Sequence, residues 1–182
     1  MSGKLIILNG PSCAGKTTLA ITFQNTVSET YYRLSIDDYL CMIPKSKLYV
    51  GDGINIRNAI HFMHSSIRLL LEEENNVIVD MIYLQKYGTE SVVDECRNFF
   101  KNYDVMMIKL KCELKELKRR AELRRNRDFN DIQRQIAMQF PDEAFDVVLD
   151  TFQYNVEECA EFIINAMNDW KRFNAIHTFK ID

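Results

Sequence analysis

The chain contains no C-x-x-C pair and no other cysteine spacing that is typical of a zinc site. Its five cysteines stand far apart, and an odd number leaves at least one thiol outside any disulfide framework. We therefore expect reduced thiols and a cytoplasmic protein. A chain of 182 residues can bury a sizeable core without disulfide staples. The cysteines are Cys13, Cys41, Cys96, Cys112 and Cys159.

An excess of positive charge is also absent. Lysine and arginine number 23 against 26 aspartates and glutamates, so no global basic field attracts nucleic acid or an anionic membrane. No apolar run approaches the about 20 residues that cross a bilayer. Residues 1–4 lead directly into a predicted strand, which leaves no room for a signal peptide. We expect neither nucleic-acid nor membrane partners, and the sequence leaves the oligomeric state open.

The sequence lacks linkers, low-complexity tracts and internal repeats, and hydrophobic residues make up 47% of it. We therefore expect one domain over residues 1–182. Short apolar runs alternate with segments of helical spacing, which indicates right-handed crossovers and a parallel sheet covered on both faces. The predicted strands are 5–8, 31–36, 77–79, 105–110 and 147–149. The first predicted helix begins at residue 16, and the others cover parts of 56–71, 86–100, 114–121, 132–140 and 156–170. The tail 171–182 gives no clear signal.

The most informative motif of the sequence is G-P-S-C-A-G-K-T at residues 10–17, which fits the pattern G-x-x-x-x-G-K-[ST]. The glycines let several backbone N–H groups converge, and the following helix adds the positive end of its dipole. Lys16 then reaches the β- and γ-phosphates of a nucleotide, and the Thr17 hydroxyl is placed to ligate Mg²⁺. A buried strand precedes the stretch and a helical stripe follows it, which is the setting that the motif requires.

The sequence thus predicts a P-loop NTPase fold of the α/β class, with a five-stranded parallel sheet and helices on both faces, similar to nucleotide and shikimate kinases. The predicted cofactors are ATP and Mg²⁺. Cys13 lies inside the loop, where a small space-filling side chain is favoured over a reactive thiol. The expected nucleotide-binding residues of the loop are Gly10, Pro11, Ser12, Cys13, Ala14, Gly15, Lys16, Thr17 and Thr18.

Three aspartates follow predicted strands, at the edge of the sheet where ligands bind in such folds. Asp37 is our candidate base for the proton of an acceptor hydroxyl. The alternative is an N-cap of a short helix near 39–43, a position for which Asp38 is the better candidate. Asp80 is a candidate for Mg²⁺ or its water, with a turn residue as the alternative. Asp150 is expected at the same edge as a nucleotide-binding residue.

The segment 113–128 contains seven basic and four acidic residues. One interpretation is a solvated helix face with pairs such as Glu116–Arg120. A nucleic-acid patch is disfavoured, because no aromatic residue interleaves before Phe129. We favour an arginine-bearing lid near 120–130, which excludes water and supplies positive charge to the transition state. His61 and His64 have the spacing of a shared metal site, but surface or packing histidines are the simpler interpretation, since no third ligand is visible.

Several short phrases of the sequence occur together in a known family. They are L-I-I-L-N-G at 5–10, S-x-A-G-K at 12–16, I-D at 36–37, V-I-V-D at 77–80, K-C-E at 111–113 and F-D-V-x-L-D-T at 145–151. With arginines at 120, 124 and 127, they cover most of the chain, which resembles the chloramphenicol phosphotransferase-like kinases.

The resemblance implies roles for individual residues. Asp37 falls on the family's catalytic base, and Lys16 and Thr17 fall on its phosphate and Mg²⁺ contacts. Arg120, Arg124 and Arg127 fall on its lid arginines, Arg120 against the adenine and the other two near the transferred phosphoryl group. Ser12 falls near the acceptor hydroxyl. Residues 41–53 and 139–142 depart from the family's pattern, so we carry over the phosphotransfer machinery and leave the acceptor open.

The sequence as a whole predicts an ATP- and Mg²⁺-dependent kinase that phosphorylates a hydroxyl group of a small molecule, with an antibiotic-like acceptor implied by the resemblance. One alternative is a kinase of a nucleotide, a sugar nucleotide or a polynucleotide end. A further alternative is a regulatory protein that binds ATP and transfers nothing.

Overall fold

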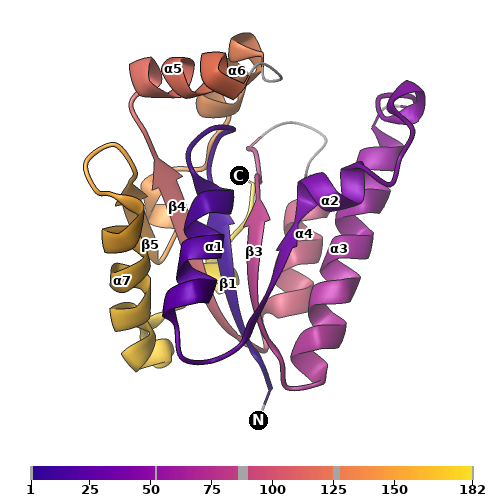
Figure 1. Ribbon diagram of the computed structural model, residues 1–182. Helices are drawn as coiled ribbons and strands as arrows, with labels where there is room; N and C mark the ends of the chain where they lie inside the picture. The colour runs from indigo at the N-terminus through magenta and orange to yellow at the C-terminus, as the bar shows by residue number, and fades with distance from the viewer. Residues whose placement is uncertain (1, 52, 86–89, 125–127, 182) are drawn as a thin grey trace.

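In the computed structural model, which describes residues 2–51, 53–85, 90–124 and 128–181, five parallel strands form one sheet in the order β2-β3-β1-β4-β5 (Figure 1). The predicted five-stranded parallel sheet is therefore confirmed. The inner strands are apolar on both faces, as expected of strands covered by helices on both sides. The strands are β1 (Lys4–Asn9), β2 (Tyr31–Ser35), β3 (Asn76–Met81), β4 (Asp104–Lys111) and β5 (Val147–Asp150).

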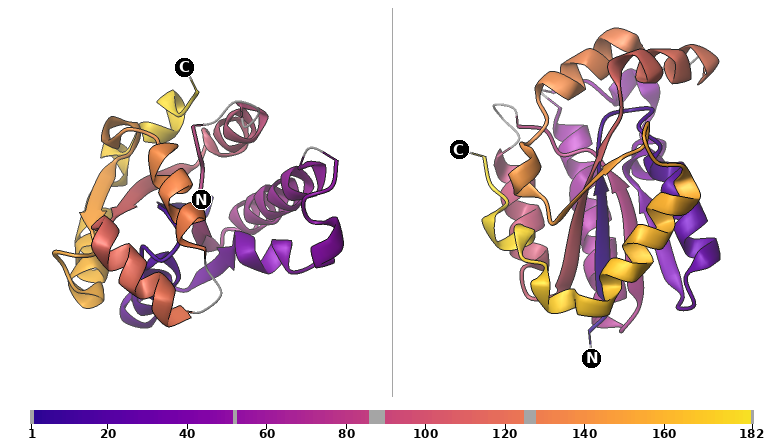
Figure 2. Two further views of the ribbon diagram at one scale, coloured as in Figure 1. Left: turned by 90° about the horizontal axis from the view of Figure 1, so that it is seen from above. Right: turned by 90° about the vertical axis from the view of Figure 1, so that its left-hand side faces the viewer.

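Helices cover both faces of the sheet and its carboxyl edge (Figures 1 and 2). Helices α1 and α7 pack on one face, α3, α4 and α8 pack on the other, and α5 and α6 lie over the ends of the strands. The α-helices are α1 (Lys16–Thr26), α2 (Ile36–Leu40), α3 (Ile54–Glu72), α4 (Glu90–Phe100), α5 (Leu114–Arg124), α6 (Phe129–Ala137), α7 (Val156–Ala166) and α8 (Ala175–Thr178). The 3₁₀ helices are η1 (Lys45–Lys47), η2 (Asp142–Ala144) and η3 (Met167–Arg172).

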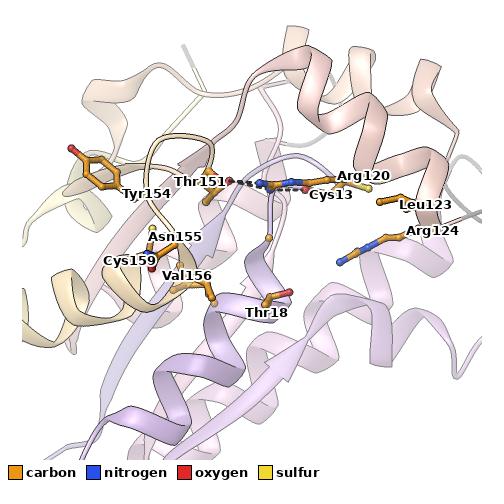
Figure 3. A pocket seen from close by; sticks show the side chains of 12 residues that line it. Cys13, Thr18, Arg120, Leu123, Arg124, Thr151, Tyr154, Asn155, Val156 and Cys159 are labelled. Carbon is orange, nitrogen blue, oxygen red and sulfur yellow. Dashed lines mark hydrogen bonds between the residues drawn. The ribbon is translucent and has the colours of Figure 1, made fainter.

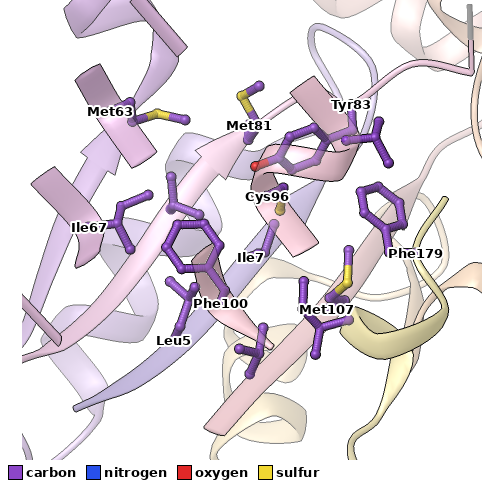
Figure 4. Close-up of a cluster of buried hydrophobic side chains, with 14 of the residues drawn as sticks. Leu5, Ile7, Met63, Ile67, Met81, Tyr83, Cys96, Phe100, Met107 and Phe179 are labelled. Atoms are coloured by element: carbon purple, nitrogen blue, oxygen red, sulfur yellow. The ribbon is translucent and has the colours of Figure 1, made fainter. Parts of the chain in front are cut away.

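Two hydrophobic clusters, one on each face, hold these layers together. Successive side chains of a strand point to opposite faces, so Leu5 and Ile7 of β1 enter the cluster beneath α3 and α4, shown in Figure 4. Ile6 and Leu8 enter the cluster beneath α1 and α7. The first cluster also includes Phe179, so the tail 171–182, which has no clear sequence pattern, contributes a fully buried ring.

The structure corrects three local predictions. The strand predicted to reach residue 36 ends at Ser35. Asp37 lies in the first turn of α2, where its negative charge interacts favourably with the positive end of the helix dipole. The N-cap of α2 is Ser35, so the expectation that Asp38 caps this helix is wrong. Helix α6 ends at Ala137, three residues before Phe140, and α7 ends at Ala166 and continues as η3.

None of the five cysteines forms a disulfide in the structure. Cys13, Cys96 and Cys159 are buried, and Cys41 is exposed. None of the helices in the described ranges combines the length and the apolar composition that crossing a membrane requires.

Candidate active site

The phosphate loop, residues 10–17, joins β1 to α1 at the carboxyl end of the sheet. Gly15, with a φ of 94°, and Cys13, with a φ of 67°, both have the left-handed backbone conformation that favours glycine. A Cβ atom at Gly10 would lie 2.8 Å from the carbonyl oxygen of Leu110, so this position requires glycine. The loop therefore has little freedom, and α1 starts from it with its unpaired N–H groups toward the loop.

Lys16, Thr17 and Asp80 form a polar cluster at the base of this loop. The Lys16 ammonium donates to the carbonyl oxygens of Gly10 at 2.8 Å and Pro11 at 3.1 Å. It also lies 3.7 Å from Asp80 Oδ1, while the Thr17 hydroxyl donates to Asp80 Oδ2. Asp80 is 5% exposed, so the nearby cation offsets the cost of burying its charge. A hydroxyl beside a carboxylate provides the hard oxygen ligands that Mg²⁺ prefers.

The strand order explains where the candidate base lies. β3 lies between β1 and β2, and Asp80 pairs with Leu8 on one side and Ser35 on the other. Asp37 comes two residues after Ser35 and is exposed. Asp37 and Asp80 both line a cavity of about 50 Å³, which Lys16 and Thr17 also line. The structure thus brings these four predicted residues to one space, although they come from three strand ends.

A second and larger cavity of about 350 Å³ lies beside the loop on the α7 side (Figure 3). Its size is that of pockets that bind small organic molecules. Thr18 and Leu19 of α1 form part of its wall, and Arg120 and Leu123 of α5 form another part. Tyr154, Asn155, Val156 and Cys159, from α7 and the segment before it, complete the lining together with Cys13, Gly15, Arg124 and Thr151.

Arg120 connects three parts of this wall. Its guanidinium donates to the carbonyl oxygen of Thr151 at 2.8 Å and to that of Cys13 at 3.3 Å (Figure 3). It also donates to Glu116 at 2.8 Å, the pair that the interpretation of this segment as a solvated helix face includes. Hydrogen bonds from Arg119 and Arg120 lower the pKa of Glu116 to about 2. The N–H groups of Arg120 thus bind protein oxygens, and its side chain lines the cavity.

The other predicted residues are placed as follows. Arg124 lines both cavities and so stands where they meet. Ser12 lines the small cavity and Thr18 the large one, while Arg127 lies outside the described residues. The Asp150 carboxylate accepts a hydrogen bond from the Phe152 N–H at 2.9 Å within a turn.

Two residues that sequence reasoning did not select contact the loop directly. The Thr151 hydroxyl donates to the Ala14 carbonyl oxygen at 2.9 Å. The Gln135 side chain accepts a hydrogen bond from the Ser12 N–H at 2.8 Å. Thr151 follows β5, so its place at the same edge as the loop was a signal in the sequence. Gln135 gave no such signal, since it is one polar residue of an amphipathic helix.

The two histidines of α3 lie away from the loop. His64 is fully buried, and its Nε2 lies 2.8 Å from the Tyr83 hydroxyl. His61 Nδ1 lies 2.6 Å from Glu95 Oε1. Among the residues that the structure describes, no three His, Cys, Asp or Glu side chains converge as a metal site. The interpretation of His64 as a packing residue agrees with this burial.

Solved structures with the same fold include kinases. The APS kinase CysC of Mycobacterium tuberculosis, in complex with AMPPNP and APS, aligns with a TM-score of 0.69 and 17% identity over 92% of this chain and 99% of that chain. Shikimate kinase from Acinetobacter baumannii, in complex with shikimate, aligns with a TM-score of 0.67 and 16% identity. The alignment covers 91% of this chain and 93% of that chain. The tunicamycin resistance protein of Deinococcus radiodurans aligns with a TM-score of 0.66 and 17% identity. The alignment covers 91% of this chain and 96% of that chain. At these identities the similarity concerns the fold, and the predicted P-loop NTPase fold is confirmed.

A curated relative is found in Mycobacterium tuberculosis (strain H37Rv), and its name provisionally assigns it as an O-phosphotransferase. The two sequences are 31% identical over 121 residues, which cover 53% of this chain and 52% of the relative. The match thus spans about half the length of the relative. A protein of the same name from strain CDC 1551 / Oshkosh gives the same values.

A comparison with protein families matches residues 3–168 to the family described as chloramphenicol phosphotransferase-like protein. The matched range begins before β1 and ends after α7, so it contains the whole sheet, both cavities and the helices above them. The resemblance inferred from short sequence phrases therefore extends through the whole sheet and both cavities, while α8 lies beyond the matched range. This chain belongs to the chloramphenicol phosphotransferase-like family.

Proposed function

We propose that this protein is an ATP- and Mg²⁺-dependent kinase that transfers the γ-phosphoryl group of ATP to a hydroxyl group of a small molecule. The observation that carries the proposal is the small cavity that Asp37 lines together with Lys16, Thr17 and Asp80. A carboxylate suited to accept a proton, a cation and a pair of hard oxygen ligands thus surround one space beside the phosphate loop. The family and the name of the curated relative support phosphotransfer.

The larger cavity is suited to the nucleoside part of ATP. Its volume of about 350 Å³ accommodates a base and a ribose, and it adjoins the start of α1 at Thr18. Because Gly15 and Arg124 line both cavities, a nucleotide in the larger one directs its phosphates toward Lys16. The APS kinase CysC, a solved structure with this fold, is in complex with AMPPNP, an ATP analogue, which supports nucleotide binding by this protein.

The donor chemistry of Thr17 and Asp80 fits Mg²⁺, and these two side chains would hold the ion or its water shell. The ion, when bound, neutralises charge on the phosphate oxygens. Lys16 is held within reach of the same region by the Gly10 and Pro11 carbonyl oxygens. We propose that its ammonium leaves these oxygens for the phosphates, which are stronger acceptors because they are charged.

In the proposed reaction Asp37 accepts the proton of the acceptor hydroxyl. A bond forms between that oxygen and the γ-phosphorus, the bond from the γ-phosphorus to the bridging oxygen breaks, and ADP leaves with the electron pair. Lys16 and Arg124 supply positive charge around the transferred group. By family resemblance Arg127 has the same role, although it lies outside the described residues. Because Asp37 is exposed, an acceptor can reach it from solvent.

A screen of acceptors tests the proposal. Purified protein is incubated with ATP and Mg²⁺, and ADP formation is measured after addition of chloramphenicol, other hydroxyl-bearing antibiotics, sugars, nucleosides or polynucleotides with free 5′ ends. We expect ADP formation to rise with a small hydroxyl compound and a phosphorylated product to appear by mass spectrometry. Stimulation by nucleotides or polynucleotide ends alone would contradict the small-molecule acceptor. Nucleotide binding without transfer to any compound would favour a regulatory protein.

A further inference from the structure

Helices α5 and α6 each form a hydrogen bond to one of two consecutive residues of the phosphate loop, Ser12 and Cys13. One helix supplies an acceptor and the other supplies a donor. From α6, the Gln135 side-chain oxygen accepts a hydrogen bond from the Ser12 N–H at 2.8 Å. From α5, Arg120 donates to the Cys13 carbonyl oxygen at 3.3 Å. The dipeptide is therefore bound at its first N–H and at its last carbonyl by two side chains more than 100 residues away in the sequence.

The conformation of this dipeptide is one that needs support. Cys13 has a φ of 67°, which side-chain-bearing residues rarely adopt, because the Cβ atom then approaches the backbone. Such conformations persist where the surrounding structure holds them. The φ of Cys13 also sets the direction of the N–H groups that follow it, from Ala14 to Thr17. These N–H groups form the nest that would bind phosphate oxygens.

Gln135 is well placed to give this support because its own helix is fixed. Ile132, one turn before it, is fully buried, and Ile136 packs against the same cluster as Leu117 and Ala121 of α5. Gln135 itself is half-buried. A side chain that projects from a packed helix holds its partner more accurately than one on a free loop.

We propose that Gln135 is a positioning residue of the phosphate loop: through the Ser12 N–H it holds the nest in the geometry that binds the β-phosphate. This inference rests on the nucleotide-binding part of the proposed function and needs no knowledge of the acceptor. Its specific consequence is that loss of the Gln135 oxygen weakens binding of nucleotides that place a β-phosphate in the nest. Contacts to the nucleoside from α5, from α7 and from the segment before α7, which form most of the larger cavity, do not depend on this hydrogen bond.

Calorimetric titrations with Mg²⁺–ADP and with AMP test this consequence. Gln135→Met keeps the length of the side chain and removes the acceptor oxygen, and Gln133→Met changes an exposed residue of the same helix. We expect Gln135→Met to lower the affinity for ADP roughly tenfold, the effect of leaving one donor without its acceptor, and to leave that for AMP unchanged. Gln133→Met should bind both as the wild type does. If Gln135→Met does not fold, Gln135→Asn withdraws the oxygen by one methylene and takes its place.

Amide hydrogen exchange gives a second readout that is independent of nucleotide. The Ser12 amide should be protected in the wild type and in Gln135→Glu, which retains an acceptor oxygen, and should exchange faster in Gln135→Met. Equal weakening of ADP and AMP binding, unchanged ADP binding, or unchanged exchange at Ser12 would each overturn the inference. A wild type that binds neither nucleotide contradicts the proposed function, and the Ser12 exchange rates then still decide whether Gln135 holds the loop.

Discussion

The Thr17 hydroxyl donates a hydrogen bond to the Asp80 carboxylate and thereby joins the start of α1 to β3. The same carboxylate lies 3.7 Å from the Lys16 ammonium. Asp80 is 5% exposed, so its negative charge is placed in a region of low dielectric, where it interacts strongly with both neighbours. This relationship links the phosphate loop to the strand that separates it from Asp37.

Replacement of Asp80 by asparagine tests its role toward the metal. Asp80→Asn removes the charge and keeps the shape, so we expect the Mg²⁺ concentration required for half-maximal transfer to rise roughly 10–100-fold. The measurement is a Mg²⁺ titration of the transfer rate at saturating ATP. Asp104→Asn, at the opposite end of the sheet, is the matched control. An unchanged Mg²⁺ requirement in Asp80→Asn would assign the carboxylate to structure alone.

Removal of the Phe179 ring tests the part of the core that the tail supplies. The ring is fully buried, with centroid distances of 4.6 Å to Phe140 and 5.4 Å to Tyr83. We expect Phe179→Ala to lower the free energy of unfolding by about 3–5 kcal/mol, since a buried ring leaves a cavity. Urea denaturation measures the change, and Phe62→Ala, at a site 60% exposed, serves as the control with an effect of about 0.5 kcal/mol or less. Similar losses in both variants would show that the tail does not pack as described.

Acid should weaken one specific contact near β4. Hydrogen bonds from Lys109 at 2.7 Å and Lys111 at 2.9 Å hold the pKa of Asp142 below its ordinary value. A carboxylate whose pKa is lowered by folding stabilises the protein above its unfolded-state pKa, and this contribution is lost as the pH falls through the folded-state pKa. Asp142→Asn should therefore be less stable than the wild type at about pH 7, with the two converging below about pH 4.

Urea midpoints of the wild type and of Asp142→Asn across that range measure the convergence. Asp131→Asn, at an exposed position of α6, is the control. Any difference between its urea midpoint and that of the wild type should be independent of the contact between Asp142 and the two lysines. A gap between the wild type and Asp142→Asn that stays constant from neutral to acid pH would show that the two lysines do not act on the Asp142 carboxylate.

The sheet and the phosphate loop could be predicted from the sequence because their signals are local. An apolar run, a glycine loop and a helical stripe follow one another within residues 5–27, and each constrains the backbone directly. The position of Asp37 was predicted wrongly: it was expected at the end of a strand, and it lies in the next element, α2. An aspartate after an apolar strand fits both a strand end and the first turn of a helix, and the chain resolves this in favour of α2.

Two side-chain contacts that hold the loop could not be predicted, because a strand end or a helical pattern does not show which distant residue a side chain reaches. Gln135 reaches Ser12 across 123 positions, and Thr151 reaches Ala14 across 137. Phe179 was missed for a different reason. It follows a helix of four residues, which is too short for a periodic pattern, and only tertiary packing assigns it to the core.

The central claim is that Asp37 takes the proton from the acceptor hydroxyl. Asp37→Asn removes this basicity at nearly constant size, and Asp38→Asn, at the neighbouring exposed residue of the same helix, is the control. The direct measurement pairs the transfer rate to the acceptor found by screening with the dissociation constant of ADP. We predict that Asp37→Asn loses roughly 10²–10⁴-fold in transfer, with ADP binding unchanged and Asp38→Asn close to the wild type. Transfer by Asp37→Asn at the wild-type rate would contradict the claim.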